Sequence, residues 1–326
     1  MNNFIDKFCF ARSALKYGLN LLDLSPGDKV LVPGYICDVV NHSFNELGLK
    51  IINYSILDDF NPDWNDINKS VKSHKIKGIL MAHYFGQPQK IDLFKSLCQE
   101  HGLYLIEDNA HGHGGFYNGH FLGTYGDIGI SSPRKILSLP YGGILFYNKK
   151  NKSNNHHSIG LKYKKYGFLN QNLKHMLNNF PKLKGKLKSL SSTGQWSDPY
   201  NGKEDRKLDY EIDKYSLRLL KKASWEKIAN KKRQLWKEWN SFCLKNNLDP
   251  VFKKIHHESC PWVFPAYSKN LKDRNFWLKW GLKKGFNFFP WPTLSDETIN
   301  KNGNEIERWK RLICFPLDIL PDKQIK

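Results

Sequence analysis

The first 150 residues alternate short apolar runs with segments whose apolar residues recur at helical spacing. The apolar runs predict buried strands at 30–32, 51–56, 76–84, 103–107 and 142–147, and the segments between them predict helices at 12–22, 38–47 and 91–101. Strands that alternate with helices imply crossover connections. The pattern therefore predicts an α/β fold with a mostly parallel sheet and helices on both faces.

The segment 149–207 has a different character. It carries 14 Lys and Arg residues against three acidic ones. We expect a solvated excursion from the main fold. The alternative is an amphipathic basic helix over 168–190, broken at Pro181, that makes a weak contact with a membrane surface or binds a polyanion.

The last third of the chain predicts a second, smaller unit. Residues 210–245 show helical spacing and form one long helix or two joined helices. Residues 246–326 hold short aromatic and proline-rich segments around one helix at 270–285. We expect a large domain at 1–240 and a small C-terminal domain at 241–326. The aromatic residues of the small domain should mostly form its core, and Arg274 should lie on its surface.

Composition narrows the class of protein. With 40% hydrophobic residues among 326, disorder over most of the length is excluded. No run of 18 apolar residues is present, so we expect no membrane-spanning helix. Six cysteines are scattered without a CxxC pair, which is typical of a reducing compartment. We therefore expect a cytoplasmic protein.

The charge is strongly positive. Fifty-one Lys and Arg against 31 Asp and Glu give a net charge of +20. A basic chain suggests nucleic acid as a partner. However, no helix-turn-helix, RNP or finger spacing is visible, so we expect no nucleic-acid partner. The charge is consistent with an anionic substrate that is steered electrostatically.

Candidate chemistry concentrates between residues 103 and 143. An apolar strand delivers Glu107 and Asp108 at its carboxyl end, where open parallel sheets bind ligands. A carboxylate there can pair with a protonated ring nitrogen of a cofactor. Lys135 follows 27 residues after Asp108 and is a candidate for an imine with an aldehyde cofactor. Spacing alone leaves open whether Lys135 is catalytic or an ordinary loop lysine.

Histidines in the same stretch suggest a metal site as an alternative. His111, His113 and His120 together with Asp108 are residue types that bind metal. The glycines within 112–115 favour a turn over a strand that would present the side chains on one face. We therefore expect no metal.

Five segments, in order along the chain, match the motifs of one known family. They are ARSAL (11–15), PGDKVLVPGY (26–35), AHYFGQP (82–88), IEDNAHGHGGFYNGHFLGTYGDIG (106–129) and KILSLPYGGIL (135–145). The sequence resembles the pyridoxal-phosphate-dependent sugar aminotransferases of the DegT/DnrJ/StrS family. The resemblance covers roughly the whole chain and is densest from Phe10 to Asn148.

The resemblance implies fold type I, with a large domain of mixed, mostly parallel sheet and a small C-terminal α+β domain. It implies pyridoxal 5'-phosphate as the cofactor and a homodimer with active sites at the subunit interface. The expected reaction moves an amino group from an amino acid, L-glutamate above all, to a nucleotide-linked keto-sugar for surface polysaccharide or other glycan synthesis.

Three alternatives remain beside that reaction. They are a sugar dehydratase, an aminotransferase for a non-sugar carbonyl, and a non-catalytic member that binds a ligand or polyanion. A histidine replaces the lysine in the dehydratase branch, so Lys135 favours transamination.

The resemblance also implies individual roles. Lys135 would be the Schiff-base lysine, and Asp108 would keep the pyridine nitrogen protonated. Arg12 and Ser13, at the start of a helix, would meet the cofactor phosphate. Ser131 or Ser132 would add a hydroxyl contact to the same phosphate.

The chain departs from the family pattern at several positions. His111 stands where glutamine is usual, and its imidazole can donate to the phenolate oxygen of the cofactor or stack near the ring. Arg12 replaces the usual threonine, and Ile130 the usual serine, with Ser131 one step later. The family's asparagine–arginine motif, through which one subunit contacts the cofactor phosphate of its partner, is not recognisable at 207–215. His83 lies either beside the cofactor or at a strand end, bonded to backbone.

Overall fold

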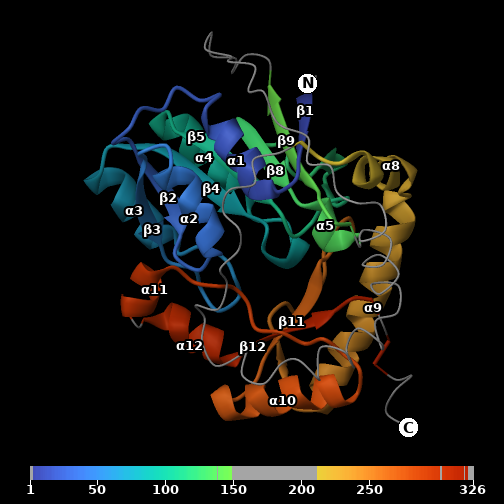
Figure 1. The fold of residues 1–326 in the computed structure, drawn as a ribbon. Coiled ribbons are helices and arrows are strands. Elements are labelled where there is room, and N and C mark those ends of the chain that lie inside the picture. The colour runs from blue at the N-terminus through green and yellow to red at the C-terminus, as the bar shows by residue number, and fades with distance from the viewer. Residues whose placement is uncertain (1–2, 138, 149–210, 302, 319, 322–326) are drawn as a thin grey trace.

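A seven-stranded sheet forms the centre of the larger part of the molecule (Figure 1). The computed structural model describes residues 3–137, 139–148, 211–301, 303–318 and 320–321. The strands are, in spatial order, β1 (Asn3–Phe8), β9 (Gly143–Asn148), β8 (Ile128–Ser131), β5 (Tyr104–Asn109), β4 (Ile76–Ala82), β2 (Lys29–Pro33) and β3 (Lys50–Tyr54). Every pairing from β8 to β3 is parallel, and β9 is antiparallel to both of its neighbours. The sheet is therefore mixed and mostly parallel, as predicted.

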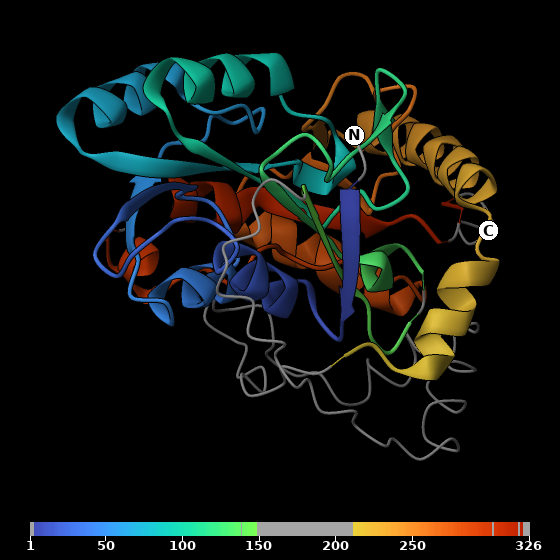
Figure 2. The same ribbon diagram turned by 90° about the horizontal axis from the view of Figure 1, so that it is seen from above.

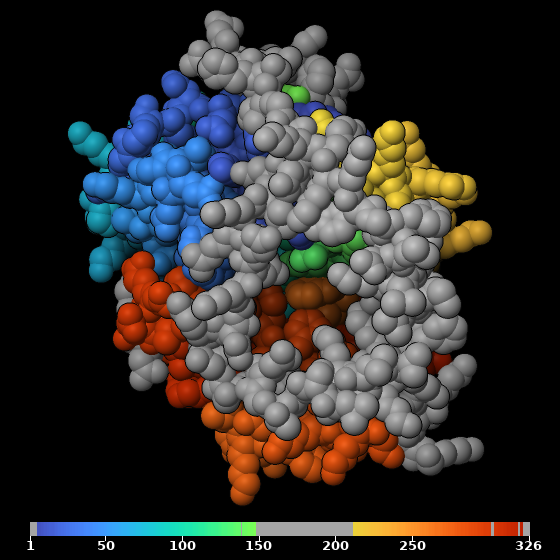
Figure 3. All heavy atoms as spheres, in the orientation of Figure 1, coloured from blue at the N-terminus to red at the C-terminus, as the bar shows by residue number. Residues whose placement is uncertain are grey.

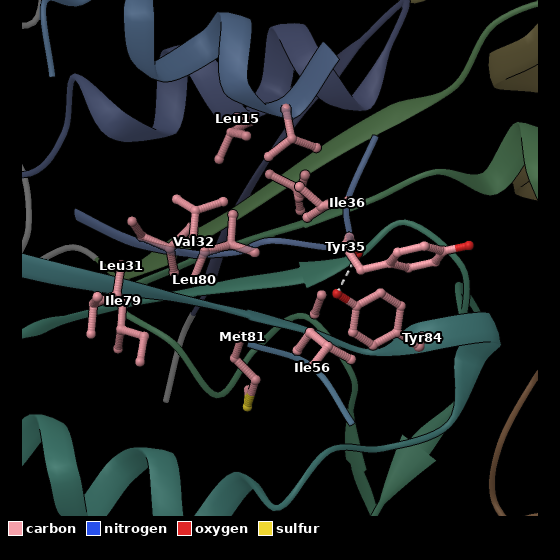
Figure 4. Packing of buried hydrophobic residues seen from close by; sticks show 14 of the residues in the cluster. Leu15, Leu31, Val32, Tyr35, Ile36, Ile56, Ile79, Leu80, Met81 and Tyr84 are labelled. Atoms are coloured by element: carbon pink, nitrogen blue, oxygen red, sulfur yellow. Dashed lines mark hydrogen bonds between the residues drawn. The ribbon is translucent and has the colours of Figure 1, made fainter. Parts of the chain in front are cut away.

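Helices cover both faces of this sheet. Figure 2 shows α1 (Ala11–Leu19) and α2 (Asp38–Asn45) on one side, and α3 (Trp64–Ser73) and α4 (Ile91–His101) on the other. The central strands are consequently apolar on both sides, and Ile79, Leu80 and Met81 of β4 are fully buried. Figure 4 shows these side chains packed with Leu15 of α1 and Val32 of β2.

Helix α1 is in close contact with the sheet at Gly18. A Cβ added at Gly18 would stand 2.7 Å from a methyl group of Leu145 and 2.9 Å from one of Ile128. A larger residue here would require these side chains or the helix itself to shift. This close packing fixes the start of α1 near the carboxyl ends of the parallel strands.

The C-terminal part has its own core. Its antiparallel sheet contains β10 (Asp249–Pro250), β11 (Val263–Tyr267) and β12 (Leu312–Pro316) in that order. Its helices are α8 (Lys214–Lys222), α9 (Trp225–Lys245), α10 (Leu271–Lys283), α11 (Asp296–Lys301) and α12 (Asn304–Arg311). Trp239 is fully buried at the centre and contacts the rings of Phe242, Phe286, Phe288 and Phe315.

Four short elements lie near the carboxyl ends of the parallel strands. They are η1 (Tyr84–Gly86), the hairpin strands β6 (Phe116–Tyr117) and β7 (His120–Phe121), and α5 (Pro133–Ile136). Phe85 within η1 adopts a left-handed backbone with φ 55°. Of these elements, η1 and α5 contribute residues to the wall of the site described below.

Most predicted elements are confirmed, with ends shifted by a few residues. Residues 211–245 form two joined helices rather than one. The expectation of a single helix after residue 246 is wrong, because α11 and α12 follow α10. They were missed because α11 has only six residues and α12 is charged on most of its surface. The division at residue 240 falls within α9 and stays a prediction.

Two further expectations concern membranes. The basic segment 149–207 and its possible helix lie outside the described residues. Among the helices that the structure does describe, none has both the length and the apolar character to cross a bilayer.

Candidate active site

A cavity opens where the carboxyl ends of β4, β5 and β8 meet. Its empty volume is about 810 Å³, open solvent at its mouth included. The walls come from the start of α1, the loop after β2, the three strand ends, α5 and one residue of the C-terminal part. Figure 3 shows the surface hollowed between the green residues near α5 and the orange and red C-terminal residues. Such a strand-end position is the usual ligand site of an open parallel sheet.

Lys135 lines this cavity from the short helix α5. The helix begins with Pro133, whose ring suits the first helical position, and the backbone N–H of Lys135 donates to Ser132 O over 3.0 Å. Lys135 Nζ lies 4.7 Å from the centroid of the Trp262 ring. This cation–π contact holds the amine at the cavity wall.

Asp108 lines the cavity at the end of β5. Its Oδ1 accepts a hydrogen bond of 2.8 Å from the Ala110 backbone N–H. Burial raises the pKa of Asp108 above its ordinary value, and the Ala110 N–H and the charge of Lys135 oppose that rise. A cationic ring nitrogen beside Asp108 would compensate the desolvated carboxylate.

Glu107 points to the opposite face of β5, because side chains alternate along a strand. Its carboxylate is fully buried and accepts backbone N–H bonds from Gly123 and Tyr125 at 2.6 Å and from Gly126 at 3.1 Å. A fourth bond of 2.8 Å joins it to Nε2 of His83. Glu107 therefore organises the loop before β8, a role that the sequence analysis did not assign.

His83 lines the cavity, but both of its ring nitrogens are engaged. Nδ1 accepts from the Gln89 backbone N–H at 3.0 Å, so the proton of the neutral ring sits on Nε2 and is donated to Glu107. His83 is thus held at the strand end by a hydrogen bond to the backbone, which is one of its two expected positions. Contact of its ring with a cofactor stays a prediction.

One ring nitrogen of His111 is engaged in a hydrogen bond with the backbone. Its Nδ1 accepts from the Phe85 N–H at 3.1 Å. Burial, with a further contribution from Lys135, lowers the pKa of His111 well below its ordinary value, so the ring is neutral. The remaining proton is on Nε2, which leaves a hydrogen-bond donor on a ring that lines the cavity. Trp262 and Trp291 contact this ring at centroid distances of 4.6 and 4.9 Å.

The residues predicted to meet a phosphate divide into two groups. Arg12 and Ser132 line the cavity. Ser13 instead lines a smaller pocket that shares Arg12 with the cavity. The hydroxyl of Ser131 lies 2.7 Å from Nδ1 of His113 on the buried side of β8. The structure thus brings together Lys135, Asp108, His111, Arg12, Ser132 and His83, and leaves Ser13 and Ser131 outside the cavity wall.

Several residues at the site were not predicted there from the sequence. Phe10, Arg134 and Trp291 line the cavity, and Trp262 lies behind Lys135 and contacts its amine. Arg134 stands next to the predicted lysine, and that position was the available signal. Trp262 and Trp291 were expected in the core, and only the tertiary structure shows them at the site.

The structure also places Arg274, Tyr35 and the side chains that could bind metal. Arg274 is fully buried, and its Nη1 donates to Trp309 O over 2.9 Å, so the expected surface position is wrong. Tyr35 is a core residue whose carbonyl accepts from the Tyr84 hydroxyl, as Figure 4 shows. Within the described ranges, metal-binding side chains do not gather in groups of three.

Comparison with protein families identifies one match. Residues 8–193 match the model of the DegT/DnrJ/EryC1/StrS aminotransferase family. The GDP-perosamine synthase of Vibrio cholerae is 30% identical over 138 residues, which are 41% of this chain and 37% of that protein. The GDP-perosamine synthase of Escherichia coli O157:H7 is 32% identical over 145 residues, 42% of this chain and 38% of that protein. The chain thus spans less than two fifths of the length of these relatives.

Solved structures share the fold over nearly the whole chain. A DegT DnrJ EryC1 StrS aminotransferase from Brucella abortus superposes with a TM-score of 0.68 at 16% identity, covering 98% of this chain and 83% of that one. PseC of Helicobacter pylori, an aminotransferase involved in the biosynthesis of pseudoaminic acid, gives 0.68 at 15% identity, covering 97% and 81%. These likenesses confirm the predicted fold.

Proposed function

The chain belongs to the DegT/DnrJ/EryC1/StrS aminotransferase family, and from this premise we propose that it is a pyridoxal-phosphate-dependent aminotransferase. Its amino donor in this proposal is an amino acid, L-glutamate above all, and its acceptor is a keto-sugar carried on a nucleotide. The product would serve surface polysaccharide or other glycan synthesis. A cytoplasmic homodimer, with a large domain at 1–240 and a small one at 241–326, completes the proposal.

One observation carries the proposal: Lys135, Asp108 and His111 line a single cavity at the ends of the parallel strands. These three groups are an amine, a buried carboxyl and a neutral N–H donor. They are the groups that a pyridine aldehyde with a phenolic oxygen requires. The donor set therefore fits the cofactor.

When bound, pyridoxal phosphate supplies an aldehyde that links to a lysine amine and a ring that accepts electrons. Asp108 would keep a proton on the ring nitrogen, and the proton on His111 Nε2 would be donated to the phenolic oxygen. The amine of Lys135 would carry a proton between the substrate carbon and the cofactor, as a general base and then a general acid. Trp262 would keep that amine at the cavity wall.

The functions of similar proteins support the substrate class. The similar proteins include two GDP-perosamine synthases and a dTDP-4-dehydro-2,3,6-trideoxy-D-glucose 4-aminotransferase of Saccharopolyspora spinosa. A nucleotide-linked sugar carries a diphosphate, and the net charge of +20 would favour its encounter with the protein.

The test begins with colour. Purified protein given pyridoxal phosphate should absorb near the visible edge, borohydride should remove that band, and mass spectrometry should place the reduced adduct on Lys135. Lys135→Ala should lose the adduct. Lys77→Ala, which removes an exposed lysine of β4, should keep it.

The second step tests the reaction. L-glutamate should bleach the visible band, and a nucleotide keto-sugar should restore it with formation of an amino-sugar. A colourless protein that cannot be loaded would contradict cofactor binding and favour a binding protein. A coloured protein that responds to no amino acid would contradict transamination and favour a dehydratase.

A further inference from the structure

Two arginines approach the same aromatic ring at one end of the cavity. The guanidinium carbon of Arg12 lies 4.4 Å from the centroid of the Phe10 ring, and that of Arg134 lies 5.0 Å from it. Arg12 is the second residue of α1, and Arg134 is the second residue of α5. All three side chains line the cavity, so two positive charges from distant parts of the sequence converge there.

Backbone packing brings these two elements together. The N–H of Gly142 donates to Cys9 O over 2.8 Å. A Cβ on Gly143 would stand 2.1 Å from the carbonyl carbon of Phe10, and one on Gly142 would stand 3.2 Å from the backbone nitrogen of Arg134. The glycine pair thus lets the start of β9 touch both Phe10 and the helix of Arg134.

The local electrostatics favour an anion at this end. The first turn of α1 contains no acidic residue, and its N-cap, Phe10, makes no side-chain capping bond. A helix N-terminus carries partial positive charge, which adds to the two guanidinium groups. The Phe10 ring attracts each guanidinium through its face, which offsets part of their mutual repulsion. Ser132 supplies a hydroxyl on the same wall.

We propose that Arg134 joins Arg12 in binding the cofactor phosphate, with both side chains fixed against Phe10. This inference rests on the proposed function, because it concerns the phosphate of the same cofactor. A phosphate monoester carries close to two negative charges at neutral pH, and guanidinium groups bind its oxygens in bidentate fashion. One chain would therefore match the charge of the phosphate without an arginine from a partner subunit.

The experiment compares two probes that differ only in the phosphate. Pyridoxal phosphate and pyridoxal are titrated into cofactor-free protein, and binding is followed by tryptophan fluorescence. Arg134→Gln and Arg12→Gln should each weaken pyridoxal phosphate binding at least tenfold and leave pyridoxal binding within about threefold. Arg134→Lys should recover part of the loss. Lys77→Gln removes one exposed charge of β4 and should leave both affinities unchanged.

Three results would overturn the proposal. Unchanged pyridoxal phosphate binding in Arg134→Gln would exclude a phosphate contact. Equal weakening of both probes would show that Arg134 only supports the fold, a point that thermal melting of each variant checks separately. A higher KM for a nucleotide-sugar with unchanged cofactor affinity would assign Arg134 to the substrate diphosphate instead.

The outcome also separates this inference from the proposed function. If wild-type protein binds neither probe and gives no borohydride adduct on Lys135, the proposed function fails. If the wild type forms the adduct and Arg134→Gln binds pyridoxal phosphate equally well, only the role of Arg134 fails.

Discussion

Replacing Glu107 by glutamine should destabilise the protein strongly although the two side chains have nearly the same shape. Oε1 of Glu107 accepts from the Gly123 N–H and from Nε2 of His83, and Oε2 accepts from the N–H groups of Tyr125 and Gly126. A glutamine turns one oxygen into an NH₂ group. In either orientation of the glutamine amide, its NH₂ group faces two hydrogen-bond donors and can accept from neither.

The surroundings cannot adapt by moving a proton. His83 cannot shift its proton to Nδ1, because Nδ1 already accepts from the Gln89 N–H. A hydrogen bond to a charged group contributes about 1.5–3 kcal/mol, so losing two gives roughly 3–6 kcal/mol. Some movement of the loop reduces this loss, and we expect Glu107→Gln to lower the free energy of unfolding by about 3 kcal/mol or more.

Urea unfolding of the cofactor-free protein, followed by tryptophan fluorescence, measures this difference. Glu258 is a matched control, because its carboxylate also accepts a backbone N–H, from Gly119, but is only partly buried. Glu258→Gln should cost less than about 1 kcal/mol, since a partly solvated amide can still accept that bond. If Glu107→Gln also costs less than 1 kcal/mol, the account of Glu107 as the organiser of the loop is refuted.

Three further changes test the site and the core. Burial raises the pKa of Asp108, so its stabilising contribution is present at low pH and is lost as the pH rises through that raised pKa. Cofactor-free Asp108→Asn should therefore have a higher melting temperature than wild type at pH 7, and the difference should shrink toward pH 4. The same variant should fail in transamination. His111→Phe keeps a ring between its aromatic neighbours but removes the Nε2 donor, and should lower kcat about tenfold to a thousandfold in a glutamate half-reaction while the borohydride adduct still forms. Trp239→Ala empties the centre of the C-terminal core and should cost about 3–5 kcal/mol in urea unfolding.

The sequence predicts the strand ends well because their physical signals are local. The apolar run before Glu107 and Asp108 is continuous, since β5 is covered on both faces, and the polar end of this strand marks the ligand edge. Lys135 follows in a family motif at the right spacing. These two residues and His111 were therefore predicted together, and the structure places all three at one cavity.

Neighbouring serines show where prediction from sequence stops. Ser131 and Ser132 are the same residue type, but Ser131 ends β8 and turns its hydroxyl to His113. Ser132 occupies the position before α5 and lines the cavity. Which one faces a ligand depends on the register of a four-residue strand that contains a glycine and was not predicted. A shift of one residue would exchange their roles.

The aromatic wall illustrates the same limit over a longer range. Trp291 lies more than 150 residues beyond Lys135, and no periodicity links it to the site. Its position depends on the packing of the two parts of the chain, in which its carbonyl accepts from the Tyr35 hydroxyl over 2.6 Å. The aromatic character of a residue predicts that it is buried, but not which cavity it borders.

Both parts of the molecule contribute residues to the site. Asp108, Lys135 and Arg12 come from residues 10–135 and are fixed by the large sheet and the helices at its edge. Trp262 and Trp291 come from the C-terminal part and touch the same cavity through Lys135 and His111. A change in the packing of the C-terminal part would therefore alter the surroundings of Lys135 and His111 as well as the part of the cavity wall that Trp291 forms.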